Sequence, residues 1–577
     1  MANSNAELAM IFENMAHMLE ILQQNPYRIQ AYRTAAATLR ELPEPIEELY
    51  QRGELSSLPG FGEALRAKIA EYLMTGRISA YEKLKDQVPV GLVEIMQIPG
   101  IGPHRARQLW EERLITSLDE LEVAARFGEL RHLKGFGPRL EARILEQVIA
   151  LQHRRTERVP LSVAQPLAQD LLTALQRFPA VLRAAMTGSL RRGRETVGKL
   201  DLLVATEQPA QVLADFRTLP FIAEVAFNTV DTLKAYTHDG PGVVLRCVPP
   251  ERWGSALQYY TGSQAHNVRL RLLAEQQGLA FGPEGLRCPN GITSCVEEED
   301  VYTGLGLPWI PPELREGNGE IAAALAGRLP RLITRADLRG DFQCHTVLSD
   351  GDADLETMAR AAEAQGLSYL VVSDHAPALT QRYGSPEAAV NALRARVDAV
   401  NRQLTSLQVL AGVELEIQPD GSLDWPEHVL EQLDFVIAAQ HAELGSSREE
   451  MTQRLLKAVQ NPGVDLIAHP TGRIFGGREG LDYAIEALFQ SAARSGVALE
   501  ISAKPTRLDL NDLYARRAAA LGIPLAISSD AHDPDGFAAL QYGVTIARRA
   551  WLEAHHLLNT RSVEELQAWR RSRRTPR

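Results

Sequence analysis

The sequence predicts a multidomain α/β chain that begins with helices and ends in a β/α barrel. Three observations support this prediction. A Gly-x-Gly motif occurs three times before residue 140, an apolar strand follows a glycine turn near residue 190, and apolar strands alternate with helices from residue 338 onward. A chain of 577 residues with 45% hydrophobic residues can bury several cores, which predicts about three to five domains.

Composition excludes several classes of protein. No apolar run approaches the roughly 20 residues that a membrane span needs, and the first residues lack a signal-peptide pattern, so we expect a cytoplasmic protein without membrane contact. Because the net charge is −12, nucleic-acid binding must rely on local patches. The four cysteines lack the CxxC spacing of zinc sites and are expected to be buried thiols: Cys247, Cys288, Cys295 and Cys344.

The repeated motif reads "LPGFG" from Leu58, "IPGIG" from Ile98 and "LKGFG" from Leu133, each followed by a helix start. Paired glycines permit a tight turn that brings main-chain N–H groups close to a phosphate. One copy could be an ordinary turn between helices, but three copies indicate binding to the DNA backbone. They resemble the helix-hairpin-helix module of DNA repair proteins. The predicted DNA-binding residues are Gly60, Gly62, Gly100, Gly102, Gly135 and Gly137, aided by Arg66, Lys68, Arg105, Arg107 and Arg139.

A second motif lies at 187–205, "TGSLRRGRETVGKLDLLVA", where a glycine turn and two arginines precede an apolar strand. Backbone N–H groups and guanidinium groups in this order suit a triphosphate. The tract "YYTGSQAHNVRLR" follows at 259–271. Together these motifs make residues 1 to about 318 resemble a family X DNA polymerase. The resemblance implies a lyase-like helical domain at 1–88, fingers at 89–155, a polymerase-beta-like palm at 156–250 and a thumb at 251–318.

The resemblance also implies roles for single residues. Lys68 stands where the lyase domain of the family places its Schiff-base amine, with Arg28 and Tyr32 beside it. A lysine attacks an aldehyde only when its pKa is lowered, so a solvated lysine that helps to hold phosphate remains the alternative. The residues implied for nucleotide binding are Gly188, Ser189, Arg192, Tyr260, Gly262, Asn267 and Arg271.

The palm departs from the family pattern. Members of the family hold two divalent ions, Mg²⁺ or Mn²⁺, with three aspartates, and this chain has Lys199, Asp201 and Val244 at those places. Two-metal phosphoryl transfer needs anionic ligands. We therefore expect Asp201 to be the one remaining catalytic ligand, with nucleotide binding kept and templated addition lost or very slow. The alternative is that Glu195 or Asp231 supplies a substitute carboxylate.

A proline-marked stretch at 319–337 is predicted to be a linker into the barrel of residues 338–577. Here strand after strand ends on a residue that can bind metal, and the carboxyl ends of barrel strands converge on one face. One such histidine could be structural, but this many in register indicate a metal site. The candidate ligands are His345, Asp350, His375, Glu414, His441, His469, Asp530 and His532.

This constellation resembles the PHP (polymerase and histidinol phosphatase) domain, a distorted TIM-like barrel. The resemblance implies up to three metals, zinc or manganese, and phosphoester hydrolysis. Gln343 replaces the first histidine of the usual His-x-His opening, and its amide oxygen is a weaker ligand than imidazole. We therefore expect one metal to bind weakly. Asp374 is expected to support His375 rather than to bind metal itself.

The combined interpretation is a monomeric DNA repair protein that binds gapped or nicked DNA and deoxynucleoside triphosphates. It predicts weak nucleotidyl transfer in the palm and 3′ to 5′ exonuclease or phosphoesterase chemistry in the barrel. Two alternatives stay open: an enzyme active only in the barrel, as a nuclease or phosphatase, and a DNA-end scaffold without catalysis. The basic tail at 570–577 is expected to be disordered.

Overall fold

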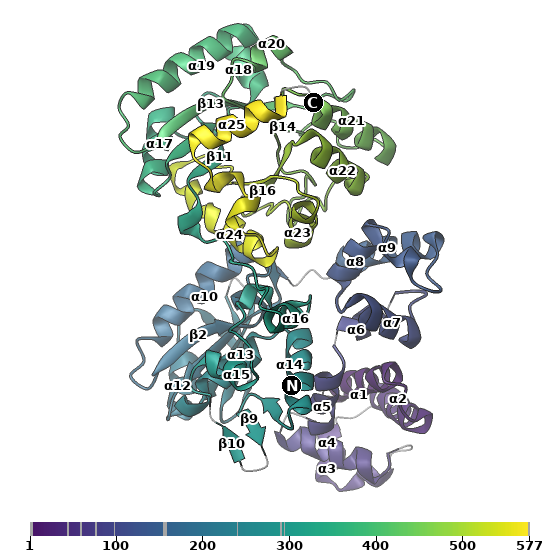
Figure 1. Ribbon diagram of the computed structural model, residues 1–577. Coiled ribbons are helices and arrows are strands. Elements are labelled where there is room, and N and C mark those ends of the chain that lie inside the picture. Colours follow the sequence, from purple (N-terminus) through teal and green to yellow (C-terminus); the bar gives the residue numbers. More distant parts are fainter. Residues whose placement is uncertain are drawn as a thin grey trace.

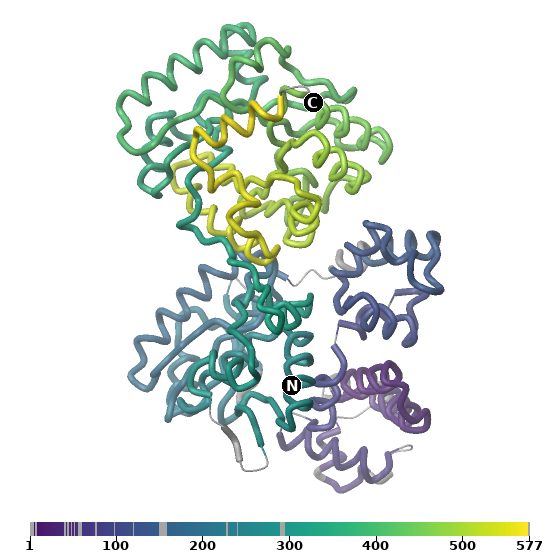
Figure 2. Tube along the Cα trace, in the orientation of Figure 1, coloured from purple at the N-terminus to yellow at the C-terminus, as the bar shows by residue number. Residues whose placement is uncertain are grey.

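The computed structural model describes residues 4–574, except 43–45, 58–60, 76–77, 90, 97, 154–157, 239–240, 289–290 and 294. In Figure 1 the barrel lies above the palm and thumb, and two helical parts from the N-terminal third lie beside them. Figure 2 follows the teal chain from the thumb up into the barrel. Within the described residues, no helix is both long enough and apolar enough to cross a membrane.

The N-terminal part is helical, as predicted. The apolar faces of its helices meet in a core that includes Phe12, Met15 and Ile69. Asn25 begins the second helix by accepting a hydrogen bond from Tyr27 N, and Pro26 suits the first helical position. These helices are α1 (Ser4–Ile21), α2 (Pro26–Glu41), α3 (Ile46–Gln51), α4 (Glu63–Thr75) and α5 (Ser79–Gln87).

The second helical part contains the other two hairpins. Its helices are α6 (Gly91–Ile95), α7 (Pro103–Arg113), α8 (Leu118–Arg126) and α9 (Pro138–His153). Gly100 and Gly135 have φ angles of +100° and +85°, which side chains other than glycine rarely adopt. Arg105 at the start of α7 donates to Gly100 O at 2.6 Å and to Gly135 O at 3.1 Å. One arginine therefore ties the two hairpins together.

The palm is a mixed sheet with the strand order β2-β4-β7-β6-β5. Strand β4 is parallel to β7, and Asp201 pairs with Val244 in the register. The helices α10 (Leu161–Leu175) and α12 (Pro209–Phe216) contribute to its core. The strands are β2 (Arg183–Thr187), β4 (Lys199–Ala205), β5 (Ile222–Asn228), β6 (Thr232–Thr237) and β7 (Gly242–Val248).

The thumb follows the palm. It contains α13 (Trp253–Thr261), α14 (Gln264–Gln276) and α15 (Glu298–Gly304), with a small antiparallel sheet of β8 (Ala280–Gly282), β9 (Gly285–Cys288) and β10 (Gly291–Thr293). The stretch 319–337, expected to be a linker, contains α16 (Glu320–Leu325). Ile321 and Ala324 are buried in the thumb core with Leu270. Apolar burial thus fixes part of this stretch to the thumb.

The C-terminal region is a nearly closed parallel barrel, which confirms the predicted fold class. Neighbouring strands pair from β11 to β17, and a bridge between Cys344 and Ala531 brings the last strand to the first. Phe342 and Phe435 fill the interior with ring centroids 5.0 Å apart. The strands are β11 (Gly340–Cys344), β12 (Tyr369–Val372), β13 (Gln408–Glu416), β14 (Phe435–Ala439), β15 (Leu466–Ile467), β16 (Ala498–Ser502) and β17 (Leu525–Ser528).

Helices surround this barrel (Figure 1). They are α17 (Leu355–Ala364), α18 (Ala376–Tyr383), α19 (Pro386–Asn401), α20 (Glu427–Leu430), α21 (Arg448–Gln460), α22 (Ile485–Ser495), α23 (Asp512–Ala520), α24 (Leu540–Arg549) and α25 (Val563–Arg574). The tail predicted to be disordered forms the end of α25. Its arginines pair with the buried carboxylate of Asp465, with Arg570 Nε at 2.8 Å and Arg573 Nη2 at 2.6 Å. This buried counter-charge is why the prediction of disorder was wrong for residues 570–574.

Two interfaces join the barrel to the other parts. Arg549 on α24 is 4% exposed and bonds to the backbone O of Arg192 at 2.8 Å and to Glu316 at 2.9 Å. At the end of α8, the ring of Phe127 lies 5.7 Å from Tyr514 on α23 and 6.1 Å from Phe489 on α22. The palm, the thumb and the hairpin domain therefore all dock on the barrel.

The palm–barrel interface predicts a sensitive glycine. Gly193 has a φ of +64°, and a Cβ there would lie 2.2 Å from Thr545 Cγ2. We expect Gly193→Ala to lower the free energy of unfolding by about 1–3 kcal/mol, through overpacking and backbone strain. Denaturant unfolding measures this loss. Gly198→Ala is the control, because its Cβ would lie 3.7 Å from Arg158 Nη1. Equal midpoints for the two variants would contradict the prediction.

Candidate metal centre and palm site

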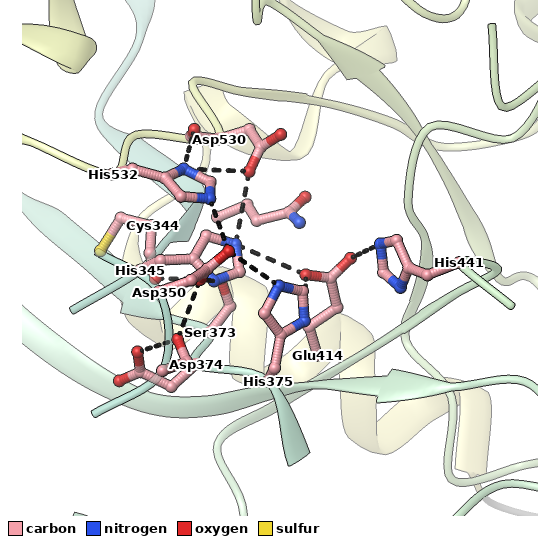
Figure 3. Close-up of polar contacts among 12 residues, drawn as sticks. Cys344, His345, Asp350, Ser373, Asp374, His375, Glu414, His441, Asp530 and His532 are labelled. Atoms are coloured by element: carbon pink, nitrogen blue, oxygen red, sulfur yellow. Dashed lines mark hydrogen bonds and ion pairs between the residues drawn. The ribbon is translucent and has the colours of Figure 1, made fainter. Parts of the chain in front are cut away.

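The barrel brings all eight candidate ligands to the carboxyl ends of its strands. His345 follows β11, His375 follows β12, Glu414 lies on β13, and His441 and His469 follow β14 and β15. Asp530 and His532 follow β17, and Asp350 reaches in from the loop after β11. In Figure 3 the labelled ligands point toward one another across the mouth of the barrel.

Glu414 is shared by two groups of ligands. Its Oε2 lies 3.4 Å from His345 Nε2, which is also 3.3 Å from Asp530 Oδ1. We call these three residues the central subsite. The other oxygen, Oε1, lies 3.3 Å from His469 Nε2 and 3.5 Å from His441 Nε2, and these three residues form the His469 subsite. Ligands that each lie about 2.0–2.2 Å from one zinc ion would be separated by about this much.

A third group surrounds Asp350. Its Oδ2 lies 3.2 Å from His532 Nε2 and 3.5 Å from His375 Nε2, and we call this group the Asp350 subsite. Among the described residues, three sets that overlap these subsites have ligand atoms that all lie within 4.8 Å of one another: His345, Asp350 and His375; His345, Asp530 and His532; and His375, Glu414 and His441. The predicted ligands therefore form one continuous cluster.

The electrostatics of the cluster favour cations. Burial raises the pKa of Glu414 and Asp530, but nearby cationic groups outweigh it and hold both pKa values well below the usual range. These groups are histidines at Glu414, and His345, Lys504 and His469 at Asp530. Burial lowers the pKa of His345, yet Asp530 and Glu414 together raise that pKa to about 9. Carboxylates gathered in a buried site stabilise positive charge, whether it comes from protons or from metal ions.

Unpartnered atoms show that the residues fit a metal. Gln343 is 0% exposed, and neither of its amide side-chain atoms has a hydrogen-bond partner. Both ring nitrogens of His345 also lack a hydrogen bond. Such groups are costly when buried unless something binds them. His469 and Asp530 have φ angles of +28° and +53°, a strain that gathers at functional sites.

Supporting residues fix the ligands, and one of them differs from expectation. Asp374 accepts hydrogen bonds from Thr346 N at 2.7 Å and Ser349 Oγ at 2.6 Å. It therefore holds the loop between His345 and Asp350, and its carboxylate forms its hydrogen bonds with Thr346 and Ser349 rather than with His375, the predicted partner. The sequence analysis missed Glu416, whose Oε2 lies 3.0 Å from His441 Nδ1. Its position two residues after Glu414, on the same face of β13, was the available signal.

The palm carboxylate has protein cations as partners. Asp201 is 8% exposed, and its Oδ1 lies 2.8 Å from Arg246 Nη1 and 3.3 Å from Lys199 Nζ. Val244, opposite Asp201 in the sheet, offers no ligand. A Cβ on Gly188 would lie 2.7 Å from Asp201 Oδ2. The described side chains around Asp201 thus do not form a two-metal ligand set.

The alternative carboxylates have other partners. Glu195 forms a paired contact with Arg473 of the barrel, at 3.0 and 2.7 Å. Asp231 accepts hydrogen bonds from the hydroxyls of Thr229 and Thr232. These contacts give no support to a substitute ligand in the palm.

The residues predicted to bind nucleotide lie at the junction of palm and thumb. Arg192 donates to Thr261 O at 2.5 Å and to Glu316 at 3.1 Å, and a Cβ on Gly262 would lie 3.4 Å from its Nη1. The Arg246 guanidinium stacks 4.6 Å from the ring of Tyr260. Ser189 lies in the short helix α11 (Gly188–Arg191). The structure therefore gathers these residues near Asp201.

Two thumb side chains that were predicted to contact the nucleotide or the template bond to other parts of the protein instead. Asn267 donates to Tyr259 O at 2.8 Å and accepts from Gln258. Arg271 pairs with Asp86 in the last turn of α5, at 2.9 Å. In this arrangement the N-terminal domain covers the arginine that the resemblance assigns to template contact.

The structure places the residues predicted for the hairpins and for the lyase pocket in different surroundings. Gly60 lies outside the described residues, whereas a Cβ on Gly62, Gly102 or Gly137 would meet open space. Lys68 is half-buried on α4 and donates to Ala64 O at 3.1 Å. Tyr32 is 3% exposed and packs its ring 5.7 Å from Phe12. Tyr32 therefore serves the core, while a catalytic role for Lys68 stays a prediction.

Four parts of this chain match known protein families. Family models match residues 3–78 (helix-hairpin-helix domain), 92–148 (SAM-like helix-hairpin-helix tandem), 256–316 (DNA polymerase beta thumb) and 341–504 (PHP domain). The DNA polymerase/3′-5′ exonuclease PolX of Bacillus subtilis is 32% identical over 568 residues, covering 98% of each chain. This chain belongs to the PolX type of family X DNA polymerases. Family membership confirms the resemblance predicted from the hairpins, the palm tract and the barrel.

Other relatives match separate parts of the chain. A probable phosphatase of Thermoanaerobacter sp. (strain X514) is 28% identical over 232 residues, which cover 38% of this chain and 89% of the relative. DNA polymerase lambda of Rattus norvegicus is 25% identical over 346 residues, covering 54% of this chain and 56% of the relative. PHP and polymerase domains generally use divalent metals, in agreement with the ligand groups in the barrel.

The His469 subsite predicts a loss of metal. His469→Ala removes one imidazole beside Glu414, so we expect about one ion fewer per chain and any nuclease activity lowered at least about tenfold. Elemental analysis and a nuclease assay measure the two effects. The control is His428→Ala in the same domain, which is exposed and contacts Glu387. Nuclease activity that survives unchanged in metal-depleted protein would refute the assignment.

Proposed function

We propose that this chain binds gapped or nicked DNA, shortens 3′ ends at the barrel centre and adds nucleotides only weakly in the palm. The observation that supports this division is the contrast between the two centres. Glu414 shares each of its oxygens with histidines, whereas Asp201 shares one oxygen with Lys199 and Arg246. Metal-dependent phosphoester chemistry needs the first kind of environment.

The proposed ligands in the barrel are the eight residues of the cluster, with zinc or manganese as the metal. When bound, such ions lower the pKa of a water molecule and neutralise charge developing on phosphate oxygens. The chain itself orients the imidazoles. His441 Nδ1 faces a Glu416 carboxylate and His532 Nδ1 lies 2.8 Å from Asp530 O. The Glu416 carboxylate can only accept, so Nδ1 of His441 carries the proton and its Nε2 is left to bind metal.

In the palm we propose Mg²⁺ or Mn²⁺ held weakly by Asp201 and the nucleotide itself. The substrates would be gapped or nicked DNA and deoxynucleoside triphosphates, and the protein would act as a monomer in the bacterial cytoplasm. A second candidate is activity in the barrel alone, as a phosphatase or nuclease. It is favoured by the similarity of 38% of this chain to nearly the whole length of a probable phosphatase.

A labelled one-nucleotide gap distinguishes these possibilities. The 5′-labelled primer is incubated with the protein and Mn²⁺, with and without deoxynucleoside triphosphates. The proposal predicts shortening in both mixtures and at most slow extension when nucleotides are present. Vigorous extension would contradict the palm assignment. A gel shift with unchanged primer would sink the nuclease assignment and leave only DNA binding.

The palm predicts a gain of function. Lys199→Asp combined with Val244→Asp should raise templated incorporation well above wild type, and each single change should do less, because two ions need the whole carboxylate set. Val244 is 4% exposed, so an unligated aspartate there costs about 1–3 kcal/mol or more. Rates are compared in Mn²⁺ among variants that fold and bind DNA. No gain in the folded double variant would place the defect elsewhere.

The hairpins predict a loss of DNA affinity. A Cβ on Gly102 meets open space within the protein, so Gly102→Ala obstructs an approaching phosphate without disturbing the fold. We expect DNA affinity to fall about tenfold, or ~1.4 kcal/mol, irrespective of sequence. Fluorescence anisotropy with two unrelated duplexes measures the change. Gly445→Ala, also in open space but in the barrel, is the control, and equal affinity of both variants would refute hairpin contact.

A further inference from the structure

A lysine lies among the metal ligands of the barrel. Lys504 follows β16, and its Nζ lies 3.0 Å from Asp530 Oδ2 and 3.5 Å from His532 Nδ1. Its side chain is 30% exposed, whereas that of Asp530 is 5% exposed. A fixed ammonium therefore contacts a carboxylate of the central subsite from the rim of the barrel.

Gln343 lies on β11 two residues before His345, in the place of the first histidine of the His-x-His opening. Both of its side-chain polar atoms are buried and without a hydrogen bond. An amide oxygen binds zinc-like ions less strongly than imidazole does. A weaker ligand therefore replaces an imidazole two residues before His345, and an ammonium already neutralises Asp530.

The lysine contacts no carboxylate of the other two subsites. The Asp350 subsite uses Nε2 of His532, while Lys504 approaches Nδ1, on the other side of the ring. The His469 subsite uses Oε1 of Glu414, which lies near His441 and His469. The positive charge of Lys504 therefore acts most directly on the central subsite.

We propose that Lys504 is the built-in cation of the central subsite, so that the barrel holds two divalent ions, at the His469 and Asp350 subsites, and an ammonium in place of a third. This inference rests on the proposed function, because it specifies the composition of the same centre. Lys504 is a positioning residue here. It keeps Asp530 neutralised and presents a permanent positive charge to an anionic phosphodiester.

The metal content of the whole chain tests the proposal. Protein dialysed against Mn²⁺ and then desalted should retain two ions per chain by elemental analysis. Lys504→Met removes the charge at similar length, and Gln343→His restores an imidazole. The double variant should retain three ions, and Lys504→Met alone should bind a third ion more tightly than wild type. Lys457→Met is the control, because that exposed lysine pairs with Asp420 away from the centre.

Two outcomes would overturn the proposal: three tightly held ions in wild type, or a folded double variant that still retains two. Counting free Mn²⁺ by electron paramagnetic resonance during titration of wild type gives a measurement that depends on no variant. Three equally tight sites there would also refute it. If the counts are as expected but wild type shortens no primer, the proposed nuclease function fails while this inference stands.

Discussion

The convergence of parallel strands on one mouth is the constraint on which the barrel depends. Each strand delivers its polar residues to the same edge, and the result is three carboxylates and five histidines within one cluster. Asp530 and Glu414 are 6% and 1% exposed, so water does not screen them. Carboxylates buried this closely require positive charge from protons, metal ions or side chains. The cluster, its supporting residues and Lys504 all follow from that need.

The palm meets a similar requirement in a different way. Asp201 is also buried, but Lys199 and Arg246 satisfy it from the same sheet. In both centres a lysine stands beside an aspartate that metal would otherwise bind. The difference lies in number: the palm retains one carboxylate at the reacting position, whereas the barrel retains enough ligands to hold ions without the lysine-paired one. Metal-dependent chemistry is therefore expected in the barrel, where the carboxylate and imidazole ligands outnumber the basic side chains that pair with them.

The docking of domains links these centres physically. Arg549 of the barrel bonds to Glu316 and to the backbone of Arg192, and Glu316 also pairs with Arg192. Phe127 of the hairpin domain packs on Phe489 and Tyr514 of the barrel. These contacts hold the palm, the thumb and the hairpin domain against the barrel, so the barrel has a structural role besides its candidate metal site.

Local patterns allowed much of this to be predicted from the sequence. The hairpin glycines and the strand-end ligands follow from short-range rules of turn geometry and strand direction, and the metal-ligand groups bring the predicted residues together. Contacts between distant segments left no such signal. Arg105 joining two hairpins, Asp465 binding the C-terminal arginines, and α16 packing on the thumb all depend on tertiary burial. Lys504 was missed because a lysine beside a strand end usually indicates a solvated rim rather than a contact with Asp530.

The location of metal ions tests the central claim most directly. Crystals of the whole protein soaked in Mn²⁺, with anomalous scattering recorded at the manganese edge, would show each ion and its ligands. In crystals without nucleotide, the account predicts strong peaks at the mouth of the barrel, beside Asp350 and His469, and none within bonding distance of Asp201. A pair of well-ordered ions on Asp201 in the palm, or a barrel mouth without any peak, would contradict it.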